Sequence, residues 1–455
     1  MTAPQSVLDL IGNTPLYEIT KFDTGPCRLF VKLENQNPGG SIKDRIGLTM
    51  IDAAERDGIL KLGGAIIEAT AGNTGLGLAL VAAQKGYKLI LIVPDKMSQE
   101  KTFHLQALGA DVIMTRSDVE KGHPAYYQDM AARMQQEIDG AFWVNQFSNP
   151  NNPRAHEKTT GPEIWAQMDH DLDAMVCGVG SGGTLTGLGR YFKKVAPNLE
   201  MILADPEGSV LAGLIKTGEM GELGSWVVEG IGEDFVPGNC DLSLAADAFV
   251  LSDVESLATA RDLLLKESIL AGSSSGTLLA AALRYCQAQI EPMRVATLVC
   301  DSGNKYLSKM FNDYWMTDQG FLDREQFGDL RDLISRRIED RAVVSVAPDD
   351  DLLIAYGRMK LSDVSQVPVL EGDQIVGIID ESDLLLALYH NEQNFKARVG
   401  DYMTSKLEVV SPSHKIENVV PILRADRVVI LVDDGRFLGL ITKVDLINHL
   451  RRKHK

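Results

Sequence analysis

Short apolar runs alternate with longer segments of helical period from about residue 27 to residue 312. The run at residues 65–69 comes directly before a segment of helical period at 73–85, and this succession repeats along the sequence. Apolar, β-branched runs that alternate with helix-length segments are typical of βαβ units, and such strands are buried on both faces of a sheet. The pattern predicts an α/β fold with a doubly wound, mainly parallel sheet. Further strands are expected at residues 88–93, 111–115, 175–177, 201–204 and 295–300.

The pattern changes near Phe311, and the last part of the chain repeats itself. The segment at residues 377–384 has a counterpart at 439–446, with a period of about 62 to 64 residues. Two such repeats are expected to stack as modules that share one core. We predict an α/β domain over residues 1–317, a polar linker over 318–341, a first repeat over 342–391 and a second repeat over 392–455.

Composition narrows the classes of function. The chain has 455 residues and a formal net charge of −18, which disfavours binding to nucleic acid or to anionic membrane. Its five cysteines form no C-x-x-C pair and indicate free thiols in a reducing compartment, and its eight histidines lack the spacing of a metal site. No apolar run reaches about 18 residues, and the start lacks a signal-peptide pattern. We expect a cytoplasmic protein without a bound metal.

Lys43 is the first candidate for chemistry. It follows Gly39 and Gly40 and begins a predicted helix, so that the backbone can approach a ligand closely at an anion-binding end. An amine held beside an anion site and away from water loses its proton more easily, and only the neutral amine attacks a carbonyl. A solvated, charged first turn of a helix is the alternative that this segment alone leaves open.

Three further loops carry polar groups next to predicted strands. The loop at residues 70–77 offers backbone N–H groups and hydroxyls to a carboxylate, and Asn73 offers an amide to a phenolic oxygen. The loop at 178–184 is suited to a phosphate. It also satisfies G-x-G-x-x-G, with Asp205 at the end of the next strand, so a dinucleotide site is an alternative. The serine cluster at 271–276, taken alone, is typical of a flexible turn.

Together, these groups match the needs of pyridoxal phosphate. The amine serves its aldehyde, the glycine loop its phosphate, the amide its phenolic oxygen and a serine its ring nitrogen. A serine does not hold the ring nitrogen protonated, which makes the ring a milder electron sink and favours β-elimination and β-replacement. The dinucleotide alternative gives no role to Lys43 or to the serine cluster.

The ordered motifs resemble the cystathionine β-synthase and cysteine synthase family of pyridoxal-phosphate enzymes. The matching segments are residues 11–16, 39–45, 70–75, 180–184, 205–209 and 229–232. The last two resemble the cystathionine β-synthase branch, and the C-terminal repeat resembles its paired CBS domains. The resemblance implies two doubly wound subdomains (fold type II), at least a homodimer, and no haem domain, because residues 11–16 already belong to the catalytic core.

The resemblance also implies roles for single residues. Lys43 holds the cofactor, Asn73 meets its phenolic oxygen and Ser274 faces its pyridine nitrogen. The phosphate is bound by Gly180, Ser181, Gly182, Gly183 and Thr184, and the substrate carboxylate by Thr70, Ala71, Asn73, Thr74 and Gln146. Three positions depart from the animal and fungal pattern, namely Ala71, Phe147 and Glu233. Because Gln146-Phe147 is what a cysteine synthase has, the donor and the thiol stay open.

The implied reaction condenses L-serine with L-homocysteine to L-cystathionine, with hydrogen sulfide release from cysteine as a related activity. The alternatives are a cysteine synthase using O-acetylserine and sulfide, a nicotinamide-dependent oxidoreductase, and a non-catalytic nucleotide sensor. In the second repeat, Thr442 and Asp445 match positions that take the ribose of an adenosyl ligand such as S-adenosylmethionine, AMP or ATP. Asp380 stands in the first repeat where Thr442 stands in the second, which favours the second cleft.

Overall fold

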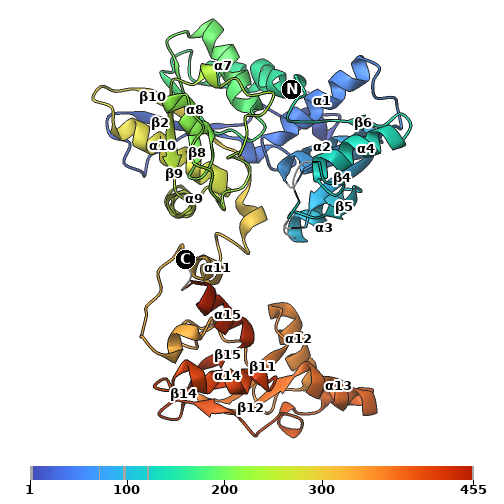
Figure 1. The fold of residues 1–455 in the computed structure, drawn as a ribbon, viewed down its shortest axis with the longest axis vertical. Helices are drawn as coiled ribbons and strands as arrows, with labels where there is room; N and C mark the ends of the chain where they lie inside the picture. Colours follow the sequence, from blue (N-terminus) through green and yellow to red (C-terminus); the bar gives the residue numbers. More distant parts are fainter. Residues whose placement is uncertain (1–3, 71, 96–98, 120–121, 453–455) are drawn as a thin grey trace. The chain divides into compact units, whose positions relative to one another are not determined.

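The computed structural model of the chain describes residues 4–70, 72–95, 99–119 and 122–452 (Figure 1). It forms two compact units, Met1–Phe311 and Asn312–Lys455. The predicted domain limit at residue 317 falls inside helix α11 (Asp313–Gln319), which belongs to the second unit. The limits of the linker and of the two repeats stay predictions.

The first unit contains two sheets, and its α/β class is confirmed. In the larger sheet the strand order is β1-β2-β10-β7-β8-β9, and only the edge pair β1 and β2 is antiparallel. The smaller sheet, β5-β4-β3-β6, is parallel throughout. The strands are β1 (Leu16–Glu18), β2 (Arg28–Leu33), β3 (Ala65–Ala69), β4 (Lys88–Pro94), β5 (Asp111–Thr115), β6 (Phe142–Trp143), β7 (Ala174–Cys177), β8 (Glu200–Pro206), β9 (Asp247–Leu251) and β10 (Arg294–Val299).

Helices pack around both sheets, as Figure 1 shows. They are α1 (Lys43–Arg56), α2 (Asn73–Lys85), α3 (Gln99–Ala107), α4 (Tyr127–Glu137), α5 (Asn151–Ala155), α6 (Gly161–Gln167), α7 (Gly183–Val195), α8 (Leu211–Thr217), α9 (Asp253–Glu267) and α10 (Ser273–Gln287). The serine cluster, taken alone, suggested a flexible turn, but Ser273, Ser274 and Ser275 form the buried first turn of α10. The flexible turn predicted from this cluster alone is wrong, because small side chains allow the end of a helix to be packed inside the protein.

Each sheet has its own apolar core. One cluster joins the six-stranded sheet to α7 and α10, and another joins the four-stranded sheet to α1 and α2. Helix α1 links the two, since Ile42 before its first turn belongs to the first cluster and Ile46, Met50 and Ile51 belong to the second. Lys43 therefore lies where the two cores meet.

The second unit contains the predicted repeat. Helix α12 (Leu352–Ser362), hairpin β11 (Gln366–Glu371) and β12 (Gln374–Asp380), and α13 (Glu381–His390) are followed by α14 (Ile416–Arg424), hairpin β14 (Val429–Asp433) and β15 (Arg436–Ile441), and α15 (Lys443–Arg452). A short strand, β13 (Val409–Val410), pairs with β14. The two hairpins shift register at equivalent places, Val369/Leu370 and Leu431/Val432.

The two repeats do not share one apolar core, so that expectation is wrong. Each repeat has its own cluster, and the cluster of the second includes Leu330, Leu333 and Ile334 from the predicted linker. A cavity with many charged side chains lies between the repeats, and such a lining cannot belong to an apolar core.

Two negative findings concern the described residues alone. None of their helices combines the length and the hydropathy that a membrane crossing requires. None of their His, Cys, Asp and Glu side chains gather in a set of three or more that could hold a metal ion. All five cysteines are free thiols.

Candidate active site

Lys43 is placed by the end of strand β10. The backbone N–H of Ile42 donates to the Cys300 carbonyl at 2.9 Å, and Ser41 pairs with Asp301 in an isolated β-bridge. A Cβ on Gly77 would lie 2.7 Å from the Lys43 carbonyl oxygen, so only glycine lets α2 pack this closely on α1. The helix that begins with Lys43 is thus fixed to both subdomains.

The surroundings of Lys43 favour its neutral form. The side chain is half-buried, and burial lowers the pKa of its amine, while the charges of Glu233 and Asp301 oppose part of that shift. A lowered pKa is what a lysine needs if it is to act as a nucleophile and then as a base near neutral pH. The structure therefore supports the chemistry predicted for Lys43.

Asn73 begins helix α2 and reaches the end of β10. Its Nδ2 donates to Asp301 Oδ2 at 2.8 Å, and its Oδ1 accepts from Lys305 Nζ at 2.7 Å. Asp301 Oδ2 also accepts from the Tyr306 hydroxyl at 2.7 Å. Asp301 and Lys305 were missed by the sequence analysis, although both follow the predicted strand at 295–300, where ligands of parallel sheets lie.

The glycine loop at the beginning of α7 is packed too tightly to hold side chains. Gly182 has φ +80°, and a Cβ there would lie 2.6 Å from the Cys240 side chain. A Cβ on Gly180 would collide with the Gly230 carbonyl, and one on Gly183 with the Asn152 side chain. Backbone N–H groups at the beginning of a helix, on residues without side chains of their own, are suited to a phosphate.

A chain of hydrogen bonds joins the carboxylate loop to the phosphate loop. The Thr74 hydroxyl donates to Gln146 Oε1 at 2.7 Å, and Asn152 Nδ2 donates both to the Gln146 carbonyl at 2.8 Å and to the Ser181 hydroxyl at 2.9 Å. In the same region, the Thr70 hydroxyl accepts from the Gly72 N–H at 3.2 Å. Ala71, the remaining predicted carboxylate contact, lies outside the described residues.

Two more groups complete the surroundings. Thr184 Oγ1 lies 3.4 Å from Nε2 of the buried His156, whose pKa burial and the charge of Lys43 hold well below the usual range. The hydroxyl of the buried Ser274 hydrogen-bonds to the Cys300 thiol, whose pKa burial raises to about 12. Cys300 thus borders both Ser274 and Lys43 as an uncharged thiol.

These residues fit pyridoxal phosphate. The site combines a glycine-lined helix beginning, an amine with a lowered pKa, a fixed carboxamide and a neutral hydroxyl, and its amine lies where the two apolar cores meet. The dinucleotide alternative fails, because Asp205 is fully buried and its Oδ2 accepts from the Ala212 N–H of α8 at 2.8 Å. Its carboxylate is therefore committed to capping a helix.

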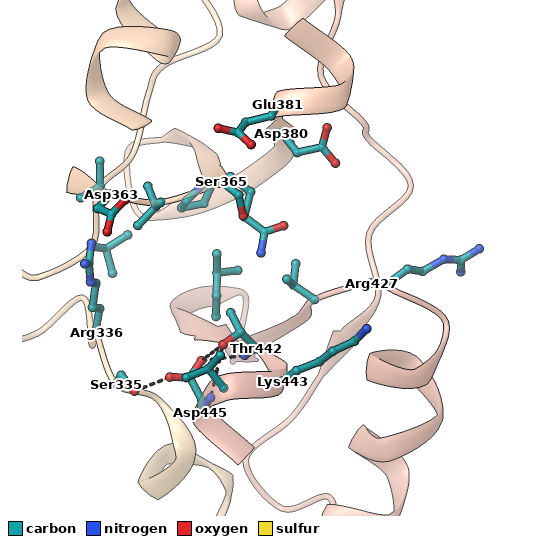
Figure 2. Close-up of a pocket in the computed structure, with 18 of the residues that line it drawn as sticks. Ser335, Arg336, Asp363, Ser365, Asp380, Glu381, Arg427, Thr442, Lys443 and Asp445 are labelled. Carbon is teal, nitrogen blue, oxygen red and sulfur yellow. Dashed lines mark hydrogen bonds between the residues drawn. The ribbon is translucent and has the colours of Figure 1, made fainter. Parts of the chain in front are cut away.

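In the second unit, a cavity of about 700 Å³ is lined by both repeats (Figure 2). The Thr442 backbone N–H and hydroxyl donate to Asp445 Oδ2 at 2.7 and 2.6 Å, and the Ser335 hydroxyl donates to the other oxygen of Asp445. The structure therefore brings together the two predicted regulatory residues. Five acidic side chains line the cavity against three basic ones, namely Asp363, Asp380, Glu381, Asp426 and Asp445 against Arg336, Arg427 and Lys443.

Comparison with known families divides the chain in the same way. Residues 7–301 match the family model described as pyridoxal-phosphate dependent enzyme. Residues 331–390 and 399–452 each match the CBS domain.

Three relatives of known name are similar to this chain, and they are named either cystathionine β-synthase or cysteine synthase. The cystathionine β-synthase of Apis mellifera is 41% identical over 319 residues, and the match covers 70% of this chain and 63% of that protein. The cystathionine β-synthase of Oryctolagus cuniculus is 35% identical, with 97% of this chain and 84% of that protein covered. Cysteine synthase 1 of Neurospora crassa is 39% identical over 69% of this chain and 84% of its own length.

Two solved structures are similar to the first unit. One is a hydrogen sulfide-producing enzyme from Fusobacterium nucleatum, 38% identical with a TM-score of 0.62, covering 67% of this chain and 100% of that one. The other is an O-acetylserine dependent cystathionine β-synthase from Helicobacter pylori, 37% identical with a TM-score of 0.62, covering 68% and 99%. The chain therefore belongs to the pyridoxal-phosphate dependent enzymes of the cystathionine β-synthase and cysteine synthase family, and it carries a pair of CBS domains.

Proposed function

We propose that this enzyme catalyses the β-replacement that condenses L-serine with L-homocysteine to give L-cystathionine. One observation carries the choice within the family. The rabbit protein named cystathionine β-synthase aligns with 97% of this chain, CBS pair included, whereas the cysteine synthase aligns with 69%. Release of hydrogen sulfide from cysteine is proposed as a related activity of the same site, and the Fusobacterium relative is named as a hydrogen sulfide-producing enzyme.

The residues of the site divide the work of this reaction. Pyridoxal phosphate supplies, when bound, an electron sink for the substrate α-carbon. Thr70, Thr74 and Gln146 orient the substrate carboxylate, and the neutral amine of Lys43 accepts the α-proton. The ammonium that results then donates this proton to the departing β-hydroxyl. The thiol sulfur of homocysteine bonds to the β-carbon thus vacated while its proton passes to the neutral amine of Lys43, and Lys43 returns that proton to the α-carbon.

The more specific part of the proposal is the identity of the two substrates, namely the amino acid that loses its β-substituent and the thiol that replaces it. Phe147 departs from the animal and fungal pattern that the chain resembles, in which tyrosine is usual at this position. The ring of Phe147 packs against that of Phe235, with the ring centroids 5.8 Å apart. The Helicobacter relative is named for O-acetylserine as its donor. A cysteine synthase reaction with O-acetylserine and sulfide is therefore the second candidate.

Product analysis by mass spectrometry tests both candidates. The purified enzyme with pyridoxal phosphate is given serine or O-acetylserine, each with homocysteine or sulfide. We expect cystathionine from serine plus homocysteine at the highest kcat/KM of the four pairs. Faster formation of cysteine from O-acetylserine plus sulfide would instead identify a cysteine synthase, and no product from any pair would refute the enzyme proposal.

We further propose that the cavity between the repeats binds an adenosyl ligand, with its ribose at Thr442 and Asp445. The excess of acidic over basic side chains disfavours a polyphosphate, so S-adenosylmethionine is preferred to ATP. Calorimetric titration of the full chain and of D445N with S-adenosylmethionine, AMP and ATP tests this. Absence of heat from all three with the full chain would refute it. A cytoplasmic homodimer or larger homo-oligomer stays a prediction from the sequence.

A further inference from the structure

The side chain of Asn73 is held at both ends by groups of opposite hydrogen-bonding type. Lys305 Nζ can only donate, and it lies 2.7 Å from one end of the carboxamide. Asp301 Oδ2 already accepts from Tyr306 and lies 2.8 Å from the other end. The amide oxygen must therefore face Lys305 and the NH₂ group must face Asp301, because the flipped amide would set NH₂ against an ammonium group.

The same lysine also touches the turn before Lys43. Its Nζ donates to the Gly40 carbonyl at 3.2 Å, in addition to Asn73. Burial lowers the pKa of Lys305, and the charges of Asp301 and Asp44 oppose that shift. One half-buried amine thus connects the turn that precedes Lys43 with the side chain that begins α2.

This arrangement leaves one hydrogen of the Asn73 amide for a ligand. The NH₂ group has two hydrogens, and Asp301 takes one of them. Among the residues that the structure describes, the other hydrogen finds no acceptor. Its direction is fixed only as long as Lys305 holds the amide oxygen, since a freed carboxamide could rotate or flip.

We propose that Lys305 is a positioning residue for the cofactor, which acts by holding Asn73 with one N–H directed at the phenolic oxygen of pyridoxal phosphate. The inference rests on the cofactor site proposed above and goes beyond the motifs that identify it. A hydrogen bond to that oxygen tunes the electronic state of the ring system, so the contact has a spectroscopic consequence as well as a binding one.

Three variants of the full-length protein test the role. K305M removes the donor and the charge, K305R keeps both, and K309M is the matched control. Lys309 lies on the same segment but pairs with Glu229 at 2.8 Å instead of with Asn73. The measurements are the visible absorption spectrum of the bound cofactor, the apparent Kd of the apoprotein for pyridoxal phosphate, and the melting temperature of the apoprotein.

We expect K305M to shift the visible band and to raise the apparent Kd about five- to tenfold, as the loss of one oriented hydrogen bond would. K305R should restore most of both properties, and K309M should match the parent protein. A parent-like spectrum and Kd in K305M would overturn the inference. So would equal losses in K305M and K305R accompanied by a lower apoprotein melting temperature, because that result indicates a structural role. A parent protein that binds no pyridoxal phosphate would instead refute the cofactor site itself.

Discussion

At the scale of single residues, the protonation of one amine decides whether the site can work. Lys43 has a lowered pKa because burial outweighs the neighbouring negative charges. We expect K43A to lose turnover and the visible band of the bound cofactor, since both the attachment and the proton transfer are assigned to the amine of Lys43. Spectra and product assays at saturating pyridoxal phosphate measure this, and a yellow, active K43A protein would contradict the assignment.

Glu233 gives a second prediction at this scale. Its pKa is raised to about 8, first by burial and then by the charge of Asp234, and its own charge raises the pKa of Lys43. Because Glu233 is mostly ionised only above about pH 8, it opposes loss of the Lys43 proton chiefly there. In E233Q that opposition is gone, so Lys43 should become reactive at lower pH.

The pH dependence of covalent labelling of Lys43 in the apoprotein measures this change. The curves of the parent and of E233Q should converge at low pH, where Glu233 is protonated, and separate in the alkaline range. E207Q is a suitable control, because Glu207 is exposed and does not act on the pKa of Lys43. Identical labelling curves for the parent and E233Q would show that the two groups do not interact.

At the scale of elements, the beginning of α7 depends on missing side chains. A Cβ on Gly183 would collide with Asn152, which holds both Gln146 and Ser181. We expect G183A to lower the free energy of unfolding by about 1–3 kcal/mol, as overpacking does, and to weaken binding of pyridoxal phosphate at least tenfold. Calorimetric unfolding and cofactor titration measure the two effects.

Gly357 provides a control for G183A, because the same glycine-to-alanine change can be made there without a collision. It lies inside α12, and no atom lies within 4 Å of the Cβ that alanine would add. G357A should therefore leave cofactor binding unchanged and stabilise its helix by up to about 1 kcal/mol. Equal effects of G183A and G357A on cofactor binding would argue against the packing explanation.

Strands and motifs were predictable from the sequence because their signals are local. Each strand expected from an apolar run lies within two residues of an observed one, and Lys43, Asn73 and Gly183 each begin a helix as the motifs suggested. Lys305 and Ser335 were not predictable in this way. Their roles depend on partners 232 and 110 residues away, and no local pattern specifies such contacts.

At the scale of the whole molecule, we expect the first unit to fold and to work without the second. The Fusobacterium structure matches 67% of this chain over the whole of its own chain, an extent similar to that of the first unit. We expect residues 1–311 alone to fold, to bind pyridoxal phosphate and to catalyse β-replacement, but not to respond to S-adenosylmethionine. Unfolding curves and product assays on the fragment and the full chain measure this, and an insoluble fragment would mean that the second unit is required for folding.

The meeting of two apolar cores at the site has a further consequence. Lys43, Asn73 and Thr74 begin helices that pack with the four-stranded sheet, whereas residues 180–184 and Ser274 lie at the beginnings of α7 and α10, which pack with the six-stranded sheet. A cofactor that contacts both sets of residues links the two subdomains, each built around one sheet. Its binding free energy therefore stabilises their association. During titration with denaturant, the visible absorbance of the bound cofactor should therefore decrease when the two subdomains separate, before either subdomain unfolds.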